Sequence, residues 1–162
     1  MTKEVLTHFP NAAFDVVAMA ASAGGITALS QILTALPGDF PASILVVQYL
    51  DPRHRSLMAE ILSRRSPLKI QEAREGDALN PGTVSIAPPN RHLLVNFDGT
   101  LTVSQSELVH FVRPSADLLF ESVAAIYKER AIAVVLTGTR SDGAMGVQAI
   151  KKMGGTVITA RG

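Results

Sequence analysis

Three short apolar runs, each followed by a segment that can form a helix, most constrain how this chain can fold. They are Asp15–Ala21, Ser43–Leu50 and Ala131–Leu136. Uninterrupted apolar runs of this length are typical of parallel strands that are buried on both faces. Strand–helix units in series predict right-handed crossovers and a mostly parallel sheet. We therefore expect an α/β, doubly wound, Rossmann-like fold of three layers, with helices on both faces of the sheet.

The remaining segments complete this pattern. Ser56 is the expected N-cap of one helix, and Pro114 is expected in the first turn of another. Asp98-Gly99 between two strand-like arms predicts an antiparallel hairpin over His92–Val103, which would interrupt or edge the parallel sheet. Apolar spacing and helix signals predict helices over 26–36, 56–65, 114–127 and 142–153, and short strands over 69–73, 83–87 and 156–159.

Composition narrows the class of protein. The 162 residues suit one domain, and 15 Lys+Arg against 14 Asp+Glu leave a net charge of +1, which gives no basic field for nucleic acid. There is no cysteine, so disulfides and thiolate catalysis are excluded, and the four histidines share no metal-ligand spacing. No apolar segment has the length of a signal peptide or a membrane span. We expect a cytoplasmic protein without membrane insertion and without a metal or organic cofactor.

Polar residues that follow the three apolar runs mark a candidate site. Ser22 follows the first run, Tyr49 and His54 fall at or after the end of the second, and Asp142 follows the third. Parallel strands bring their carboxyl ends to one edge, where sites form. A hydroxyl, a base and a carboxylate gathered there could form a nucleophile, base and acid set. The small residues 23–25 could supply backbone N–H groups for an oxyanion.

The residues alone leave other interpretations open. Ser22 could cap the following helix or contact a phosphate, because AASAG matches the G-x-S-x-G nucleophile turn only in part. Asp142 could simply cap the helix that follows it. His54 could be a solvent-exposed loop residue. No complete nucleotide-binding glycine motif is present, so Gly24-Gly25 is weak evidence for a nucleotide site.

Several longer stretches occur in an order that is more specific than any single motif. They are AASAGG, ALPGDFPASILVVQ, LDPRHRSLMAEILSRR, VSIAPPNRHLLV, HFVRPSADLLFESVA and VVLTGTRSDGAMGVQAIKKMGGTVI. Over about residues 14–160 the chain thereby resembles the catalytic domain of the chemotaxis protein-glutamate methylesterases, the CheB-type family. The resemblance implies hydrolysis of γ-glutamyl methyl esters on the cytoplasmic helices of methyl-accepting chemotaxis receptors, and deamidation of glutamines in some members, by a Ser-His-Asp triad.

The resemblance assigns roles to the candidate residues one by one. It implies that Ser22 is the nucleophile and Asp142 the orienting carboxylate. The family's catalytic histidine follows the glutamine of V-V-Q, and here Tyr49 holds that position. An unperturbed tyrosine has a pKa of about 10 and an unperturbed histidine a pKa of about 6.5, so Tyr49 is expected to be a poor general base. His54 as a substitute base stays a hypothesis. Arg140, where the family has glycine, could form a salt bridge with Asp142 or crowd the pocket.

The same resemblance predicts the domain organisation and two functions. Residues 1–13 are expected to be a short leader, and 14–162 a CheB-type domain that lacks the C-terminal segment usual in relatives. We expect no receiver domain of the kind that many members carry, and we therefore expect any phosphorylation signal to come from a separate partner. The first functional hypothesis is a receptor methylesterase. The alternative is a catalytically impaired member that acts as a binding module in receptor signalling.

Overall fold

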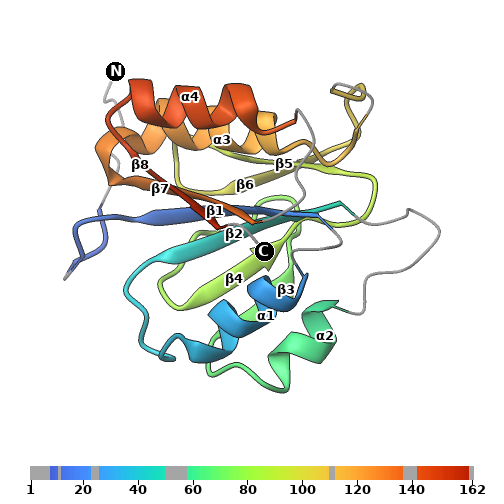
Figure 1. The fold of residues 1–162 in the computed structure, drawn as a ribbon, viewed down its shortest axis with the longest axis vertical. Helices are drawn as coiled ribbons and strands as arrows, with labels where there is room; N and C mark the ends of the chain where they lie inside the picture. The colour runs from blue at the N-terminus through green and yellow to red at the C-terminus, as the bar shows by residue number, and fades with distance from the viewer. Residues whose placement is uncertain are drawn as a thin grey trace.

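The structure is a computed structural model that describes residues 8–10, 12–22, 26–49, 58–109, 112–136 and 142–160. Its centre is a six-stranded sheet of order β3-β4-β2-β1-β7-β8 (Figure 1), in which every neighbouring pair is parallel. This confirms the parallel sheet predicted from the apolar runs. The strands are β1 Val16–Ala21, β2 Ser43–Gln48, β3 Lys69–Glu72, β4 Thr83–Ile86, β7 Ala131–Leu136 and β8 Thr156–Ala160.

Helices cover both faces of the sheet, as a doubly wound fold requires. Helices α1 Ile26–Ala35 and α2 Met58–Ser63 lie on one side, and α3 Ala116–Tyr127 and α4 Ala144–Lys152 on the other (Figure 1). The central strands are buried on both faces because alternate side chains enter the two cores. Val17 packs in the core with α1, whereas Ala20 packs in the core with α3. A 3₁₀ turn, η2 Lys128–Arg130, connects α3 to β7.

The predicted hairpin forms, but the sequence-based prediction placed it wrongly. Strands β5 His92–Val95 and β6 Leu101–Ser104 pair antiparallel around Asp98-Gly99 and make a separate two-stranded sheet. Gly99 has φ of +79°, which suits glycine in this turn. The hairpin neither interrupts nor edges the parallel sheet, because it buries Leu93 and other apolar residues in the core that contains α3.

Two predicted helix starts also differ from the structure. Ser115 is the N-cap of α3, since its hydroxyl accepts a hydrogen bond from Leu118 N, so Pro114 precedes the cap rather than lying in the first turn. Helix α4 begins at Ala144 and not at Asp142. Ser56, the expected cap of α2, lies outside the described residues. None of the helices in the described ranges is both long and apolar enough to cross a membrane.

A buried ion pair holds the amino ends of β1 and β7. Asp15 accepts hydrogen bonds from Arg130 Nε at 2.8 Å, from Arg130 Nη2 at 3.0 Å and from Phe9 N at 2.8 Å, and His8 Nδ1 lies 2.5 Å from the same carboxylate. Burial alone would raise the pKa of Asp15, but the hydrogen bonds from Arg130, Phe9 and His8 hold it below its usual value. This cluster joins residues 8–10 to the sheet.

Candidate active site

The strand ends bring two of the predicted site residues side by side. Tyr49 N donates to the carbonyl of Ala21 at 3.1 Å, which continues the pairing of β1 with β2 by one residue. Ser22 and Tyr49 therefore occupy neighbouring strand ends, and adjacent strands lie about 4.8 Å apart. Tyr49 packs against the core that contains α3 and Ala20, and strand alternation directs Ser22 to that same side. Ser22 is half-buried.

Asp142 is joined to this pair through Tyr49. The Tyr49 hydroxyl donates a hydrogen bond to Asp142 Oδ2. Burial raises the pKa of Tyr49 far above its usual range, and the hydrogen bond and charge of Asp142 raise it further. The phenol thus stays protonated at neutral pH and acts as a donor toward the acid, so it cannot take up the proton of a serine as a phenolate.

Asp142 lies at the N-terminus of α3. It is 2% exposed, and it accepts from Ser115 Oγ at 2.7 Å, from Ala116 N at 2.6 Å and from Asp117 N at 3.4 Å. Free N–H groups and the helix dipole stabilise negative charge at this position. The interpretation of Asp142 as a cap of the following helix is wrong, because its carboxylate binds the start of α3 and α4 has Gly143 as N-cap.

A second carboxylate makes the reciprocal contact. Asp117 Oδ1 accepts from Gly143 N at 2.9 Å and from Gly146 N at 2.7 Å, and so holds the N-terminus of α4 from the first turn of α3. Burial raises the pKa of Asp117, and the charge of Asp142 adds to this effect. A Cβ at Gly146 would lie 2.6 Å from Phe120 Cβ, so glycine there lets the two helices approach. Asp142 accepts hydrogen bonds from the start of α3, and Asp117 of α3 accepts hydrogen bonds from the start of α4. These reciprocal contacts hold Asp142 in place.

A buried histidine in turn positions Ser115. His92 is fully buried; its Nδ1 accepts from Ser115 N at 3.1 Å, and its Nε2 lies 2.8 Å from the Glu107 carbonyl oxygen. This pattern assigns the neutral tautomer with hydrogen on Nε2. Three residues of this network were not among the predicted site residues: His92, Ser115 and Asp117. A local signal for two of them was present in RPSADLLF, which reads as a helix start, but the contacts with Asp142 are tertiary.

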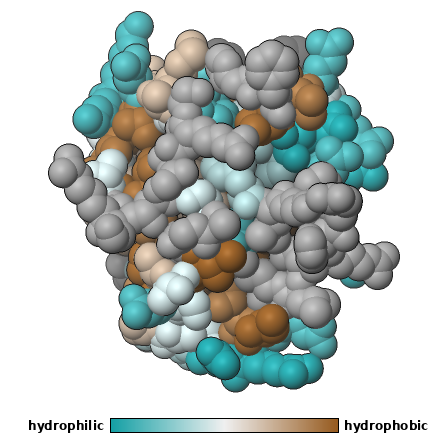
Figure 2. Space-filling model, turned by 45° about the vertical axis from the view of Figure 1, so that its right-hand side comes forward, coloured by the Kyte–Doolittle hydropathy of each residue, from teal (hydrophilic) through white to brown (hydrophobic). Residues whose placement is uncertain are grey.

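Other predicted features of the site lie outside the described residues. They are the small-residue turn 23–25, the substitute base His54 and the cation Arg140. Within the described ranges, no three His, Cys, Asp or Glu side chains are grouped closely enough to hold a metal ion. Figure 2 turns this edge of the molecule toward the viewer, and the apolar residues on that face lie in several separate patches.

Three comparisons with known proteins agree with one another. The family model described as CheB methylesterase matches residues 17–161, a range that contains Ser22, Tyr49 and Asp142. The "Putative protein-glutamate methylesterase/protein-glutamine glutaminase" of Leptospira interrogans is 41% identical over 145 residues, which are 90% of this chain and 75% of that protein. The "Protein-glutamate methylesterase/protein-glutamine glutaminase" of Symbiobacterium thermophilum is 42% identical over 142 residues, 88% of this chain but 39% of the relative.

A solved structure shares the fold as well as the sequence. The crystal structure of the Thermotoga maritima CheB methylesterase catalytic domain superposes with a TM-score of 0.84 at 37% sequence identity. The match covers 90% of this chain and 79% of that chain. It confirms the α/β fold with a mostly parallel sheet that the sequence predicted.

Proposed function

Because this chain belongs to the CheB methylesterase family of chemotaxis-related hydrolases, we propose that it hydrolyses γ-glutamyl methyl esters on a chemotaxis receptor or related signalling protein. Glutamine side chains would be deamidated at the same site. We place the reaction in the cytoplasm, where a separate protein would supply any phosphorylation signal. Family membership and the gathering of Ser22, Tyr49 and Asp142 at one edge of the sheet support this proposal.

The proposed chemistry is acyl transfer through a covalent intermediate. Ser22 Oγ attacks the γ-carbonyl carbon of the ester, the C–O bond to the methoxy group breaks, and methanol leaves with the serine proton. Water then attacks the acyl-serine, which releases the glutamate carboxylate and restores Ser22. Both steps need a group that takes a proton and returns it. In the family this group is the histidine whose position Tyr49 holds.

The hydrogen bond from Tyr49 to Asp142 carries the second part of the proposal, which is that turnover is low. The phenol donates a hydrogen bond to the Asp142 carboxylate and keeps its own proton, because its raised pKa holds it neutral, so it does not accept a proton from Ser22. General-base catalysis contributes about 10²- to 10⁴-fold in typical enzymes. A site without it retains only the part of catalysis that comes from binding and from oxyanion stabilisation.

The same hydrogen bond favours a second candidate function. In this second function the domain does not hydrolyse the ester at all. It binds its receptor and acts as a binding module in receptor signalling. The two functions share a binding surface and differ in whether Ser22 forms an acyl intermediate. Binding to a methylated fragment together with product formation therefore separates them.

Methanol release from a methylated receptor fragment tests the proposal. We expect a slow, Ser22-dependent release from the parent and a gain of about 100-fold or more in Tyr49→His, because an imidazole restores a base near neutral pH. Ser22→Ala should abolish release in both backgrounds. Fast release by the parent that His54→Ala removes would contradict the assignment of Tyr49 and make His54 the base. If the parent and Tyr49→His both bind the methylated fragment tightly and neither releases methanol, the result would favour the binding module.

A further inference from the structure

Ser115 holds one particular oxygen of the Asp142 carboxylate. Its hydroxyl has a single proton, which it donates to Asp142 Oδ1 at 2.7 Å, because an ionised carboxylate can only accept. The other oxygen, Oδ2, accepts from Ala116 N at 2.6 Å and from the hydroxyl of Tyr49. The two oxygens therefore have separate donors, and Oδ2 is the one that faces the side chain at position 49.

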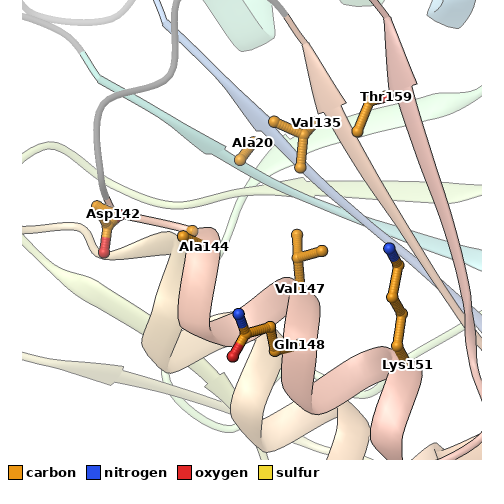
Figure 3. Close-up of a pocket in the computed structure, with 9 residues that line it drawn as sticks. Ala20, Val135, Asp142, Ala144, Val147, Gln148, Lys151 and Thr159 are labelled. Atoms are coloured by element: carbon orange, nitrogen blue, oxygen red, sulfur yellow. The ribbon is translucent and has the colours of Figure 1, made fainter.

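Hydrogen bonds decide how the carboxyl group of Asp142 is turned. The torsion about the Cβ–Cγ bond of an aspartate has broad minima, so it does not by itself fix which oxygen faces which neighbour. Asp142 stands before α4, beside Ala144 (Figure 3), whereas Ser115 caps the other helix, α3. The hydrogen bond from Ser115 to Oδ1 is thus a restraint that a distant segment places on the rotation of the acid.

Ser115 is itself held on both its backbone and its side chain. It is fully buried, its N–H donates to His92 Nδ1 at 3.1 Å, and its hydroxyl oxygen accepts from Leu118 N at 3.4 Å. His92 is fixed in turn by the Glu107 carbonyl oxygen, which lies 2.8 Å from Nε2. The hydroxyl of Ser115 is therefore aimed at Asp142 before any substrate binds.

We propose that Ser115 is a positioning residue of the hydrolysis and that His92 keeps it in place. By holding Oδ1, Ser115 presents Oδ2 of Asp142 to the side chain at position 49. A histidine at that position needs a carboxylate oxygen to fix its tautomer and to stabilise its cation when it takes the serine proton. This inference rests on the proposed function, because it deepens how the same site prepares its acid.

The restraint does not depend on the phenol of Tyr49. The donors to Oδ1 come from the start of α3, and Ala116 N holds Oδ2 from the same place. An exchange at position 49 therefore leaves the acid held. Tyr49→His supplies a base near neutral pH, so it is the background in which the role of Ser115 can be measured as a rate.

The first test measures kcat and KM for methanol release from the methylated receptor fragment by Tyr49→His and by double variants. Ser115→Ala and Ser115→Gly both remove the hydroxyl, but glycine is a much better N-cap than alanine, so they weaken α3 to different extents. We expect both to lower kcat about tenfold or more and to leave KM within about twofold, because a displaced acid impairs the step after binding.

Ser122→Ala is the matched control. It removes another hydroxyl of α3, one that accepts from Val95 N at 3.1 Å, donates to the Leu119 carbonyl at 2.8 Å and makes no hydrogen bond to Asp142. It should change kcat by less than about twofold, because it leaves every donor to the acid in place. Urea denaturation of each variant gives the loss of stability with which its kcat is compared.

A second measurement reads the orientation of the acid without turnover. The hydroxyl proton of Tyr49 in the parent is identified in the ¹H NMR spectrum as the downfield resonance that Tyr49→Phe lacks. Ser115→Gly in the parent should shift or broaden this resonance, because Oδ2 of Asp142 is no longer held toward the phenol. Ser122→Ala should leave it unchanged.

Three results would overturn the inference while the proposed function stands. They are an unchanged kcat in Ser115→Gly, an unchanged Tyr49 resonance in that variant, or a fall in kcat that follows the loss of stability from glycine to alanine. Equal losses of kcat in Ser115→Ala and Ser115→Gly, at unequal stabilities, would support it. If Tyr49→His releases no methanol, the proposed hydrolysis fails, and the role of Ser115 in it fails as well.

Discussion

Asp15 and Asp142 are both almost fully buried at opposite ends of the sheet, yet they are held by different kinds of partner. At the amino ends of the strands, Asp15 receives two hydrogen bonds from the Arg130 guanidinium. At the carboxyl ends, the donors to Asp142 among the described residues are neutral: two hydroxyl groups and the first N–H groups of α3. A third carboxylate, Asp117, lies close enough to oppose the charge of Asp142.

The Asp15–Arg130 ion pair, called the clamp below, is a structural contact, whereas Asp142 lies in a site where the carboxylate keeps its charge. A guanidinium pairs with a carboxylate through two hydrogen bonds and neutralises it, so the pair is self-contained. Neutral donors and a helix N-terminus stabilise a carboxylate without cancelling its charge, which remains able to act on a neighbouring group. In this chain that neighbour is Tyr49 rather than a histidine, so the charge raises the pKa of a phenol.

The largest effect should come from breaking the clamp. Arg130→Met leaves the Asp15 carboxylate buried without its cation, and we expect the free energy of unfolding to fall by about 3 kcal/mol. Urea denaturation at neutral pH measures this loss. The double variant Asp15→Asn with Arg130→Met should recover part of it, because no unpaired charge remains. If Arg130→Met lowers the free energy of unfolding by less than about 0.5 kcal/mol, the Asp15–Arg130 pair contributes no more than a weak surface salt bridge.

A smaller effect, with a defined pH dependence, is expected for Asp15→Asn. The folded pKa of Asp15 lies below its ordinary value of 3.8. Its contribution to stability is therefore fully present above about pH 4 and is lost as the pH falls through the lower folded pKa. At neutral pH, Asp15→Asn should lower the free energy of unfolding by about 2 kcal/mol. As the pH falls below about 4, the stability of the variant should decrease less steeply than that of the parent. If the parent and Asp15→Asn lose stability with the same slope below about pH 4, the lowered pKa of Asp15 does not contribute to stability as proposed.

Local features of this chain could be predicted from the sequence better than the contacts between distant segments, for a physical reason. Strand β7 was predicted to the residue, because an apolar run bounded by polar segments is a local signal. The two paired arms of the hairpin were predicted, because an Asp-Gly turn specifies its own pairing, but its place apart from the parallel sheet was not, because that place depends on packing against α3. Asp142 was expected at the edge of the sheet, since parallel topology alone brings the strand ends together.

The contacts of the candidate site could not be predicted from the sequence, because they join segments that are distant along the chain. A carboxylate two residues before a helix is locally a cap for that helix, and nothing local shows that Asp142 turns instead to α3. The close packing of α3 on α4 at Gly146 lets Asp117 hold the start of α4, and it leaves Asp142 to hold the start of α3. The Tyr49 substitution could be identified from the resemblance, but its hydrogen bond to Asp142 required the fold.

Removing the neutral donors of Asp142 one at a time shows how many of them hold its carboxylate. Tyr49→Phe takes away one donor and leaves those from Ser115 and Ala116, so we expect the free energy of unfolding to fall by only about 1.5 kcal/mol. Thermal and urea unfolding measure this change. Tyr49→His can still donate to the acid, and it should therefore stay closer to the parent. A loss as large as that of Arg130→Met would mean that Asp142 depends on one donor rather than several.

The smallest expected effect has the opposite sign and lies at Asp117. Burial and the charge of Asp142 raise the pKa of Asp117, so its contribution to stability is present below the ordinary value of 3.8 and is lost as the pH rises through the folded pKa. Asp117→Asn keeps an oxygen that can accept from Gly143 and Gly146 and removes the opposing charge. It should raise the free energy of unfolding at neutral pH by about 1 kcal/mol.

The matched control for that gain is Asp117→Ala, which removes the acceptor as well as the charge. It should lower the free energy of unfolding, because the N–H groups of Gly143 and Gly146 lose a buried partner. The same change at Asp15 gives the contrast, since Asp15→Asn destabilises where Asp117→Asn stabilises. If both asparagine variants destabilise alike at neutral pH, Asp117 is a second clamp. The carboxyl end of the sheet would then hold its charges no differently from the amino end.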